Sequence, residues 1–295
     1  MEIRKVKKGI YYFENTTNIP LFETDEGFVI FDSPIDKDKA KKVRKLLDEI
    51  GFKPKFLILS HHHADHTGGA CFLKETFNLE VLSSEIEKAF IESSVLEPVY
   101  LSQGANPPHE FLTKWVKSAS VKIDRIVEEG PLSLGGKPFE ILDLSGHSIG
   151  MIGIKVDNII FSADAFFSLE ILQKYIVPYF HDKDKYIEKM KSIKSQNFEF
   201  ILPSHGTLLS REEAVRIIDE NIRVVEEIEQ KVLNAISSPK TIEEILEKLQ
   251  IPTSDFVVSN LIKSSLQSIL FSLLNKGKAE ARVENCIVRF VRRGL

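Results

Sequence analysis

The sequence predicts an α/β protein whose functional residues lie just beyond the ends of buried strands. Short apolar segments alternate with segments of helical period through the first 207 residues. A histidine or an aspartate follows shortly after each of four apolar segments, at residues 56–59, 139–142, 159–161 and 198–202. Polar side chains delivered by separate strand ends are the usual way in which a rigid α/β scaffold builds a site.

Composition and charge restrict the class of protein. The 295 residues can bury a large core, as one large domain or as a domain with an appendage. With 43% hydrophobic residues, 28% charged residues and a net charge of −4, the chain has a globular composition and no global bias towards nucleic acid. The basic N-terminus is followed by no apolar h-region, so we expect neither a signal peptide nor a membrane span. Only two cysteines occur, so a disulfide framework is not expected. This favours the reducing cytoplasm as the compartment.

The N-terminal elements follow from alternation and turn signals. Strands are expected at residues 10–13, 19–22, 28–31, 56–59 and 79–82, and helices at residues 36–50, 68–77 and 85–91. Asp25-Glu26-Gly27 has the composition of a turn before the third strand. Gly51 ends the first helix, because glycine accepts the left-handed conformation found after helix ends.

The next part of the chain is less regular. Residues 96–120 contain aromatic residues, prolines and a glycine, and two interpretations have equal weight: a substrate-facing loop or an ordinary packed excursion. Strands resume from residue 121, and residues 151–161 predict a hairpin that turns at Asp157-Asn158. A helical region then leads to the apolar strand at residues 198–202.

The most specific motif is His61-His62-His63-Ala64-Asp65-His66, directly after the strand at residues 56–59. Imidazole nitrogens and carboxylate oxygens are the usual ligands of zinc and of similar metals. In an extended chain His61 and His63 point to the same side and can hold one ion. The turn at residues 64–69 then presents Asp65 and His66 to a second position. A surface histidine cluster is the alternative, but the preceding strand favours metal ligation.

The complete series of such residues resembles that of the metallo-β-lactamase superfamily. The histidine motif is followed by Gly68-Gly69, Gly146-His147, Asp164 and His205-Gly206, and Asp32 fits the motif that precedes it. The resemblance covers residues 1–207, a metallo-β-lactamase-like catalytic domain. It implies a four-layer αβ/βα sandwich, with two mixed sheets face to face and helices outside.

The resemblance also implies a site for two divalent metal ions. Three residues would hold each ion, and a seventh residue, Asp164, would bridge the two ions. The first ion would be held by His61, His63 and His147, and the second by Asp65, His66 and His205. Asp32 is expected to orient a ligating histidine from outside the set of ligands. His62 is expected either to contact the ligands from outside in the same way or to face solvent. Zinc is the first expectation, with iron or manganese as alternatives, because sites of this kind accept all three.

The expected mechanism follows from the two ions. They can share one water and lower its pKa from about 15.7 towards neutral, which gives a metal-bridging hydroxide as the nucleophile. Asp65 is then placed for catalytic proton transfer. Tyr179 and His181, between the bridging aspartate and the last ligand, are candidates for contact with substrate, and surface or packing roles are their alternative.

Residues 208–295 predict a helical C-terminal domain that resembles a winged helix. Capping boxes begin two helices, at Ser210 with Glu213 and at Thr241 with Glu244. A third helix is expected over residues 255–274, followed by strands at residues 279–283 and 286–291 joined at Glu284-Asn285. The terminal segment is basic, through Lys276, Lys278, Arg282, Arg289, Arg292 and Arg293. Phosphate binding is one interpretation, but packing or a homodimer is favoured.

The leading functional hypothesis is a cytoplasmic metal-dependent hydrolase for a small-molecule ester, thioester, lactone or amide. A glyoxalase II-like thioesterase is one form of it, although no cationic contacts for glutathione can be matched in the tail. The alternative is a ribonuclease-like, nucleic-acid-processing phosphodiesterase whose C-terminal domain docks the nucleic acid; some superfamily members with such tails are ribonucleases. A non-enzymatic ligand sensor is a weaker third interpretation, because the ligand set is complete. His63 also favours hydrolysis, because the oxidoreductase branch has an acidic residue there.

Overall fold

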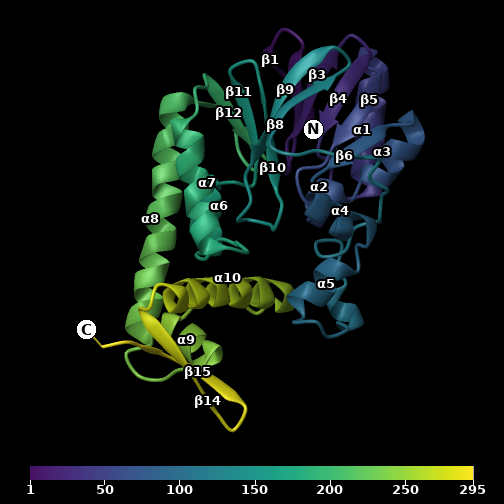
Figure 1. Cartoon of the computed structure of the whole chain (residues 1–295). Coiled ribbons are helices and arrows are strands. Elements are labelled where there is room, and N and C mark those ends of the chain that lie inside the picture. The colour runs from purple at the N-terminus through teal and green to yellow at the C-terminus, as the bar shows by residue number, and fades with distance from the viewer. Residues whose placement is uncertain (295) are drawn as a thin grey trace.

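Two mixed β-sheets form the centre of the protein (Figure 1) in a computed structural model that describes residues 1–294. The first sheet has the order β1-β2-β3-β4-β5-β6-β7 and the second the order β13-β12-β11-β10-β9-β8. The strands of the first are β1 (Glu2–Lys7), β2 (Ile10–Glu14), β3 (Ile19–Thr24), β4 (Gly27–Phe31), β5 (Pro54–Ile58), β6 (Glu80–Ser83) and β7 (Arg125–Ile126). Those of the second are β8 (Gly130–Leu134), β9 (Lys137–Asp143), β10 (Ile152–Val156), β11 (Ile159–Ala163), β12 (Phe200–Pro203) and β13 (Leu209–Ser210).

Strand alternation assigns the two faces of the first sheet to different cores. In β4, Val29 and Phe31 belong to the core between the sheets, whereas Phe28 and Ile30 belong to the core under the outer helices. This division follows from the period of two residues along a strand. Between the sheets, the ring of Phe22 meets that of Phe161 edge-on at 4.8 Å, a favourable aromatic geometry.

Helices cover the outer face of each sheet. On the first sheet these include α1 (Lys37–Ile50) and α3 (Ala70–Phe77), and on the second α7 (Lys183–Ser195) and α8 (Arg211–Ala235). Figure 1 shows these two helical layers on opposite sides of the sheets. The predicted α/β class and four-layer sandwich are therefore confirmed.

Parallel pairing brings strand ends to one edge. β4 and β5 are parallel, as are β11 and β12, while most other neighbours are antiparallel. The segments that follow these four strands carry Asp32, the histidine motif, Asp164 and His205. The sheet topology therefore gathers residues from distant parts of the chain at a single edge.

Several local elements differ from the expectation. The predicted turn at residues 64–69 contains a one-turn helix, α2 (Ala64–Thr67), and the insertion at residues 96–120 contains α5 (Leu96–Leu101) and the short 3-10 helix η1 (His109–Phe111). The remaining helices of this region are α4 (Glu85–Glu92) and α6 (Leu169–Tyr175).

The C-terminal segment has the predicted order of three helices and a hairpin. After α8 come α9 (Ile242–Leu249), α10 (Phe256–Asn275), β14 (Ala279–Glu284) and β15 (Ile287–Arg292). Both predicted capping boxes are formed, at Ser210 and at Thr241. The hairpin turns at Asn285 and Cys286, with φ of 52° and 63°, one residue later than predicted. That this segment is a winged-helix domain of its own remains a prediction.

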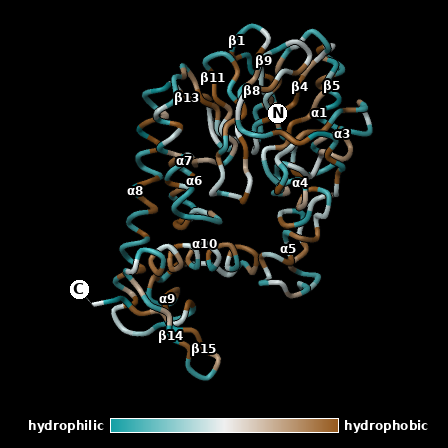
Figure 2. The backbone as a smooth tube through the Cα atoms, in the orientation of Figure 1, coloured by the Kyte–Doolittle hydropathy of each residue, from teal (hydrophilic) through white to brown (hydrophobic). Residues whose placement is uncertain are grey.

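Helix α10 crosses below the sandwich from α8 to α5 (Figure 1). Its buried residues Leu266, Ile269 and Leu270 belong to the same continuous core as the second sheet. By length and composition alone α10 is apolar enough to cross a membrane. Figure 2 shows hydrophobic residues interleaved with polar ones along it, as in the core helix of a folded protein.

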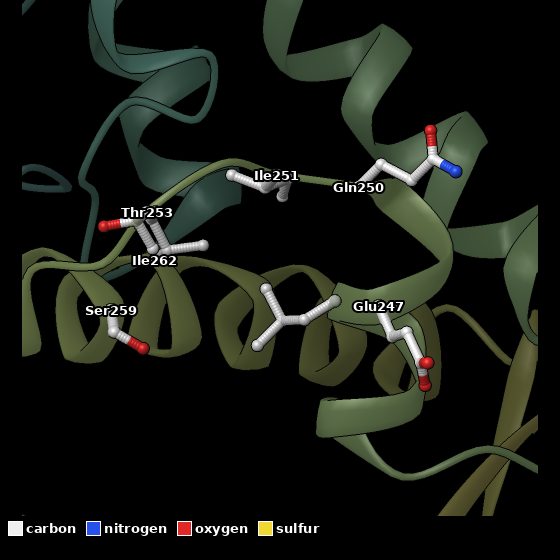
Figure 3. A pocket seen from close by; sticks show the side chains of 7 residues that line it. Glu247, Gln250, Ile251, Thr253, Ser259 and Ile262 are labelled. Carbon is white, nitrogen blue, oxygen red and sulfur yellow. The ribbon is translucent and has the colours of Figure 1, made fainter.

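A pocket of about 260 Å³ lies between α9 and α10. Ile251, Ile262 and Thr253 line it together with Glu247 and Gln250 (Figure 3). It shares no residue with the histidine motif, so it is a feature of the C-terminal segment.

Candidate metal centre

Four overlapping groups of ligand-type side chains occur among the described residues, and within each group the ligand-type atoms lie within 4.8 Å of one another. Three of them meet at the edge where the strands end: His61 with His63 and His147, His61 with His66 and Asp164, and Asp65 with His66 and His205. The fourth is His62 with His63 and Glu97. The structure therefore brings together all seven residues that the sequence singled out as ligand candidates.

In the first group, three imidazole nitrogens converge on one point. His63 Nδ1 lies 2.9 Å from His61 Nε2 and 3.0 Å from His147 Nε2. Burial lowers the pKa of His63 to about 3 and also holds the pKa values of His61 and His147 below their ordinary value. These imidazoles are therefore neutral, which is the form that binds metal ions.

The group of Asp65, His66 and His205, together with Asp164, combines two carboxylates with two histidines. His205 Nε2 lies 3.2 Å from Asp65 Oδ2 and 3.4 Å from Asp164 Oδ2, and His66 Nε2 lies 3.5 Å from Asp164 Oδ1. Burial opposes ionisation of Asp164, but His205 and His66 outweigh it and hold the pKa of that carboxyl well below its usual range. Asp164 also lies 3.6 Å from His147 Nε2, so its two oxygens reach both groups.

Two buried atoms of this cluster lack a hydrogen-bond partner among the described residues: His66 Nε2 and Asp164 Oδ1. Leaving a buried polar atom unpaired costs about 1–3 kcal/mol. Both atoms face the cluster, and a divalent cation binds imidazole nitrogen and carboxylate oxygen alike. The donor set therefore fits metal ions.

Fixed acceptors orient four of the five clustered histidines through Nδ1. His66 Nδ1 donates to Asp32 (2.8 Å), and His61 Nδ1 donates to the Ser60 hydroxyl (2.9 Å), which itself donates to Asp32 (2.8 Å). His147 Nδ1 donates to the carbonyl of Tyr179 (3.0 Å) and His205 Nδ1 to that of Thr16 (2.7 Å). Each of these bonds leaves Nε2 facing the cluster.

Asp32 lies outside the cluster of candidate ligands. It is fully buried and also accepts a hydrogen bond from the backbone N–H of Ser60 (2.7 Å). Through Ser60 and His66, this one carboxylate controls the direction of two imidazole rings.

Two glycines allow the backbone to pack closely here. A Cβ at Gly68 would lie 1.8 Å from the carbonyl oxygen of Ile35. Gly146, directly before His147, has φ +127°, and a Cβ there would lie 2.4 Å from the backbone nitrogen of Tyr186. Both positions require glycine because any side chain would displace the loops that carry the candidate ligands.

The His62 side chain faces neither the centre of the cluster of candidate ligands nor the solvent. It is buried between two glutamates, with Nδ1 2.5 Å from Glu87 and Nε2 2.6 Å from Glu97. Burial alone would lower its pKa, but the two carboxylates outweigh burial and raise the pKa of His62 to about 10. The imidazolium therefore donates to both. These glutamates carry no signal in the sequence, because they lie in helical segments with other charged residues.

Tyr179 and His181 lie beside the first group. The Tyr179 ring centre is 5.4 Å from that of His63 and 5.5 Å from that of His147. Burial lowers the pKa of His181, and Tyr100 donates a hydrogen bond to its Nδ1 (2.6 Å). Tyr100 comes from α5, so residues of the 96–120 insertion do reach the neighbourhood of the cluster.

The loop between β2 and β3 also supports the site and had no signal in the sequence. Asn18 Nδ2 donates to the carbonyls of Pro203 (3.0 Å) and Gly206 (2.8 Å), on either side of His205. The Thr17 hydroxyl lies 3.4 Å from Asp65 Oδ2. Most of these contacts are to backbone carbonyls, whose positions depend on the folded chain.

Comparison with known proteins agrees with this geometry. Residues 13–205 match the family described as the Metallo-beta-lactamase superfamily. The chain is 27% identical over 236 residues to a hydroxyacylglutathione hydrolase of Vibrio vulnificus, covering 77% of each chain. It is 31% identical over 116 residues to a hydroxyacylglutathione hydrolase of Haemophilus influenzae, covering 39% of this chain and 50% of that one.

Solved structures show the same fold. A beta-lactamase domain protein from Burkholderia ambifaria superimposes with a TM-score of 0.77 at 17% identity, covering 99% of this chain and 94% of that one. A metallo-beta-lactamase family protein from Thermus thermophilus gives a TM-score of 0.73 at 16% identity, covering 98% of this chain and 100% of that one.

Proposed function

Because the chain belongs to the metallo-beta-lactamase superfamily and is a metal-dependent hydrolase, we propose that its seven clustered side chains hold two divalent metal ions and cleave a small molecule. The substrate class is an ester, thioester, lactone or amide. One observation carries the proposal: imidazole nitrogens and carboxylate oxygens converge at one edge of the sheets, and two of these atoms are buried without a hydrogen-bond partner among residues 1–294. Zinc is the first candidate, with iron or manganese as alternatives.

The residues divide between two positions. The first ion would be held by His61, His63 and His147, the second by Asp65, His66 and His205, and Asp164 would reach both. When bound, such ions supply an activated water and polarise the substrate's carbonyl oxygen. Asp65, whose Oδ2 lies 3.2 Å from His205 Nε2 and 3.4 Å from the Thr17 hydroxyl, is placed to hold the proton of that water. The half-buried side chains of Tyr179 and His181 would contact the substrate beside the first ion.

Within this substrate class we place thioesters first. The Vibrio and Haemophilus relatives are both named hydroxyacylglutathione hydrolases, and the bond that such names describe is a thioester. The acyl carbon of a thioester needs the same two things that an ester needs: an activated water and polarisation of the carbonyl.

A nucleic-acid substrate receives less support from the charges of the C-terminal segment. Five of the six basic side chains in residues 276–293 have acidic partners within 4.0 Å: Lys276 with Asp184, Lys278 with Glu229, Arg282 and Arg293 with Glu280, and Arg289 with Glu244. Phosphate binding needs cations whose charge is not already paired. We therefore favour packing or self-association as the role of this segment. The presence of only two cysteines favours the cytoplasm as the compartment.

A substrate panel tests the proposal. The metal-loaded protein should hydrolyse a thioester, and more slowly an ester, lactone or amide, while a phosphodiester should remain intact. His63→Ala and Asp65→Ala should abolish hydrolysis with an unchanged far-ultraviolet circular dichroism spectrum, and Asp38→Ala, on the exposed face of α1, should retain it. Full activity in either site variant, or no hydrolysis after metal reconstitution, would contradict the proposal.

A further inference from the structure

We propose that Glu97, held by His62 and Glu87, positions His63 by accepting a hydrogen bond from its Nε2–H when Nδ1 binds a metal ion. We name Glu87, His62 and Glu97 the buried relay. This inference rests on the metal site proposed above, and it assigns a task to two glutamates that the site does not otherwise use.

His63 differs from the other four clustered histidines. Each of those turns Nε2 to the cluster and gives Nδ1 to a fixed acceptor within 3.0 Å. His63 turns Nδ1 to the cluster, 2.9 Å from His61 Nε2. Its outward atom is therefore Nε2, and a ligating imidazole needs an acceptor on that side to keep its proton and its direction.

Glu97 is the acidic group on that side. Its Oε1 lies 3.9 Å from His63 Nε2, about 1 Å beyond a hydrogen bond. Metal binding at Nδ1 fixes the proton on Nε2 and makes it a stronger donor, so the contact would close when the metal binds. A small rotation of either side chain is enough, because the carboxylate already faces the ring.

The buried relay holds Glu97 in place. Glu97 is 6% exposed, and its other oxygen, Oε2, lies 2.6 Å from His62 Nε2. The opposite nitrogen of His62 binds Glu87, which is 0% exposed. A charged group at this depth is stable only when hydrogen bonds and opposite charge compensate it, and the histidine between the two glutamates supplies both.

Glu87 in turn is fixed by backbone and side-chain donors. It accepts hydrogen bonds from the backbone of His62 (2.9 Å), the hydroxyl of Ser148 (2.7 Å) and the backbone of Gly150 (2.8 Å). Ser148 follows His147 directly in the chain. The buried relay therefore joins α4, α5 and the loops of two candidate ligands, and it couples the 96–120 insertion to the position of the first ion.

Glu97→Gln tests this role, because glutamine keeps the shape of the side chain and removes its charge. We expect the variant to bind one of its two metal equivalents about 10–100-fold more weakly in a chelator competition, with the other equivalent unchanged. The visible absorption of the cobalt-substituted variant should change, kcat should fall and KM should stay close to the wild-type value. Glu97→Asp, which retains the charge, should restore part of the lost affinity. Glu85→Gln, on the exposed side of α4, is the matched control and should match the wild type in each measurement.

A measurement on the zinc-loaded wild-type protein stands independent of how the variants fold. Nitrogen-15 NMR of the imidazoles should show a proton on His63 Nε2 that exchanges slowly with solvent. In Glu97→Gln the same proton should exchange rapidly. A His63 Nε2 proton that exchanges rapidly in the wild type would overturn the inference, as would wild-type affinity for both metals in a folded Glu97→Gln protein. Failure of the wild type itself to bind metal would instead overturn the proposed function.

Discussion

At the scale of single residues, Asp32 is the acceptor that two of the clustered histidines share. It binds His66 directly and His61 through Ser60, and it has no exposed surface. Asp32 also has φ 65°, a left-handed conformation that aspartate and asparagine adopt more readily than most residues. Its backbone and its side chain therefore both suit the short polar residue found there.

Asp32→Asn should weaken metal binding without changing the backbone. Asparagine tolerates the left-handed conformation. However, one carboxylate oxygen of Asp32 accepts from the backbone N–H of Ser60 and the other from the Ser60 hydroxyl and His66 Nδ1, so an amide NH₂ at either place would face a donor. We expect about 10–100-fold weaker binding of one metal ion, measured by chelator competition. Asp38→Asn, on the exposed surface of α1, should bind both ions as the wild type does. Equal affinities in Asp32→Asn and the wild type would show that Asp32 does not orient the ligands.

At the scale of elements, α10 reaches the site through the loop that carries Tyr179. The Ser265 hydroxyl accepts from the backbone N–H of Phe180 (3.3 Å), and the Ser268 hydroxyl accepts from that of Lys183 (2.8 Å). The carbonyl of Tyr179, in the same loop, accepts from His147 Nδ1. A C-terminal helix thus helps to position a candidate ligand in the sandwich.

Ser268→Ala should therefore destabilise the protein and loosen this loop. It removes the acceptor of a partly buried backbone N–H, which costs about 1–3 kcal/mol, and urea unfolding would measure the loss. Ser259→Ala, on the same helix but at the pocket between α9 and α10, should change stability by about 0.5 kcal/mol or less. If both variants unfold at the same urea concentration, the serine contacts of α10 do not hold the loop.

Elements with local signals could be predicted from the sequence. The capping boxes at Ser210 and Thr241 determine where α8 and α9 begin, because all of their partners lie within one turn. The edge that carries the candidate ligands was also predictable, since histidines and aspartates follow apolar strands there. Their division between two ions came from the resemblance to the superfamily. Glu87 and Glu97 were not, because they are buried by α4 and α5 packing on His62. The helix α2 was missed because four residues are too few for a periodic signal.

At the scale of the whole molecule, the sandwich and the C-terminal segment share one core and one partly buried charge cluster. Leu266 of α10 and Tyr186 of α7 belong to the same hydrophobic cluster. Next to it, Lys183 is 3% exposed and pairs with Glu229, while Asp184 accepts from Lys276 (2.6 Å) and Ser272 (2.7 Å). These charges connect α7, α8 and α10.

The acid stability of the protein should depend on Asp184. Burial alone would raise its pKa, but contacts with Lys276, Ser272 and Lys183 lower the pKa to about 2. A carboxyl whose pKa is lower in the folded state stabilises the fold above its unfolded value of about 3.9 and loses that effect as the pH falls towards 2. The side chain is 45% exposed, so solvent screening reduces the expected contribution to about 1 kcal/mol.

Asp184→Asn should therefore lower the free energy of unfolding at pH 7 by about 1 kcal/mol, and the difference should fall to a small fraction of that value at pH 2. Urea unfolding of the metal-free proteins at several pH values measures this without interference from metal loss. Glu188→Gln, at an exposed position on the same helix, serves as the control. A difference between Asp184→Asn and wild type that is as large at pH 2 as at pH 7 would exclude the carboxylate charge as its cause.

The central claim is that seven side chains from separate chain segments hold two metal ions. Elemental analysis of the reconstituted protein tests it most directly, with His147→Ala and His205→Ala as variants of the two positions and His109→Ala as the control. We predict two divalent ions per chain in the wild type and the control, and about one in each site variant, because each loses a ligand of a different ion. One ion or none in the wild type, or two in both site variants, would contradict the claim.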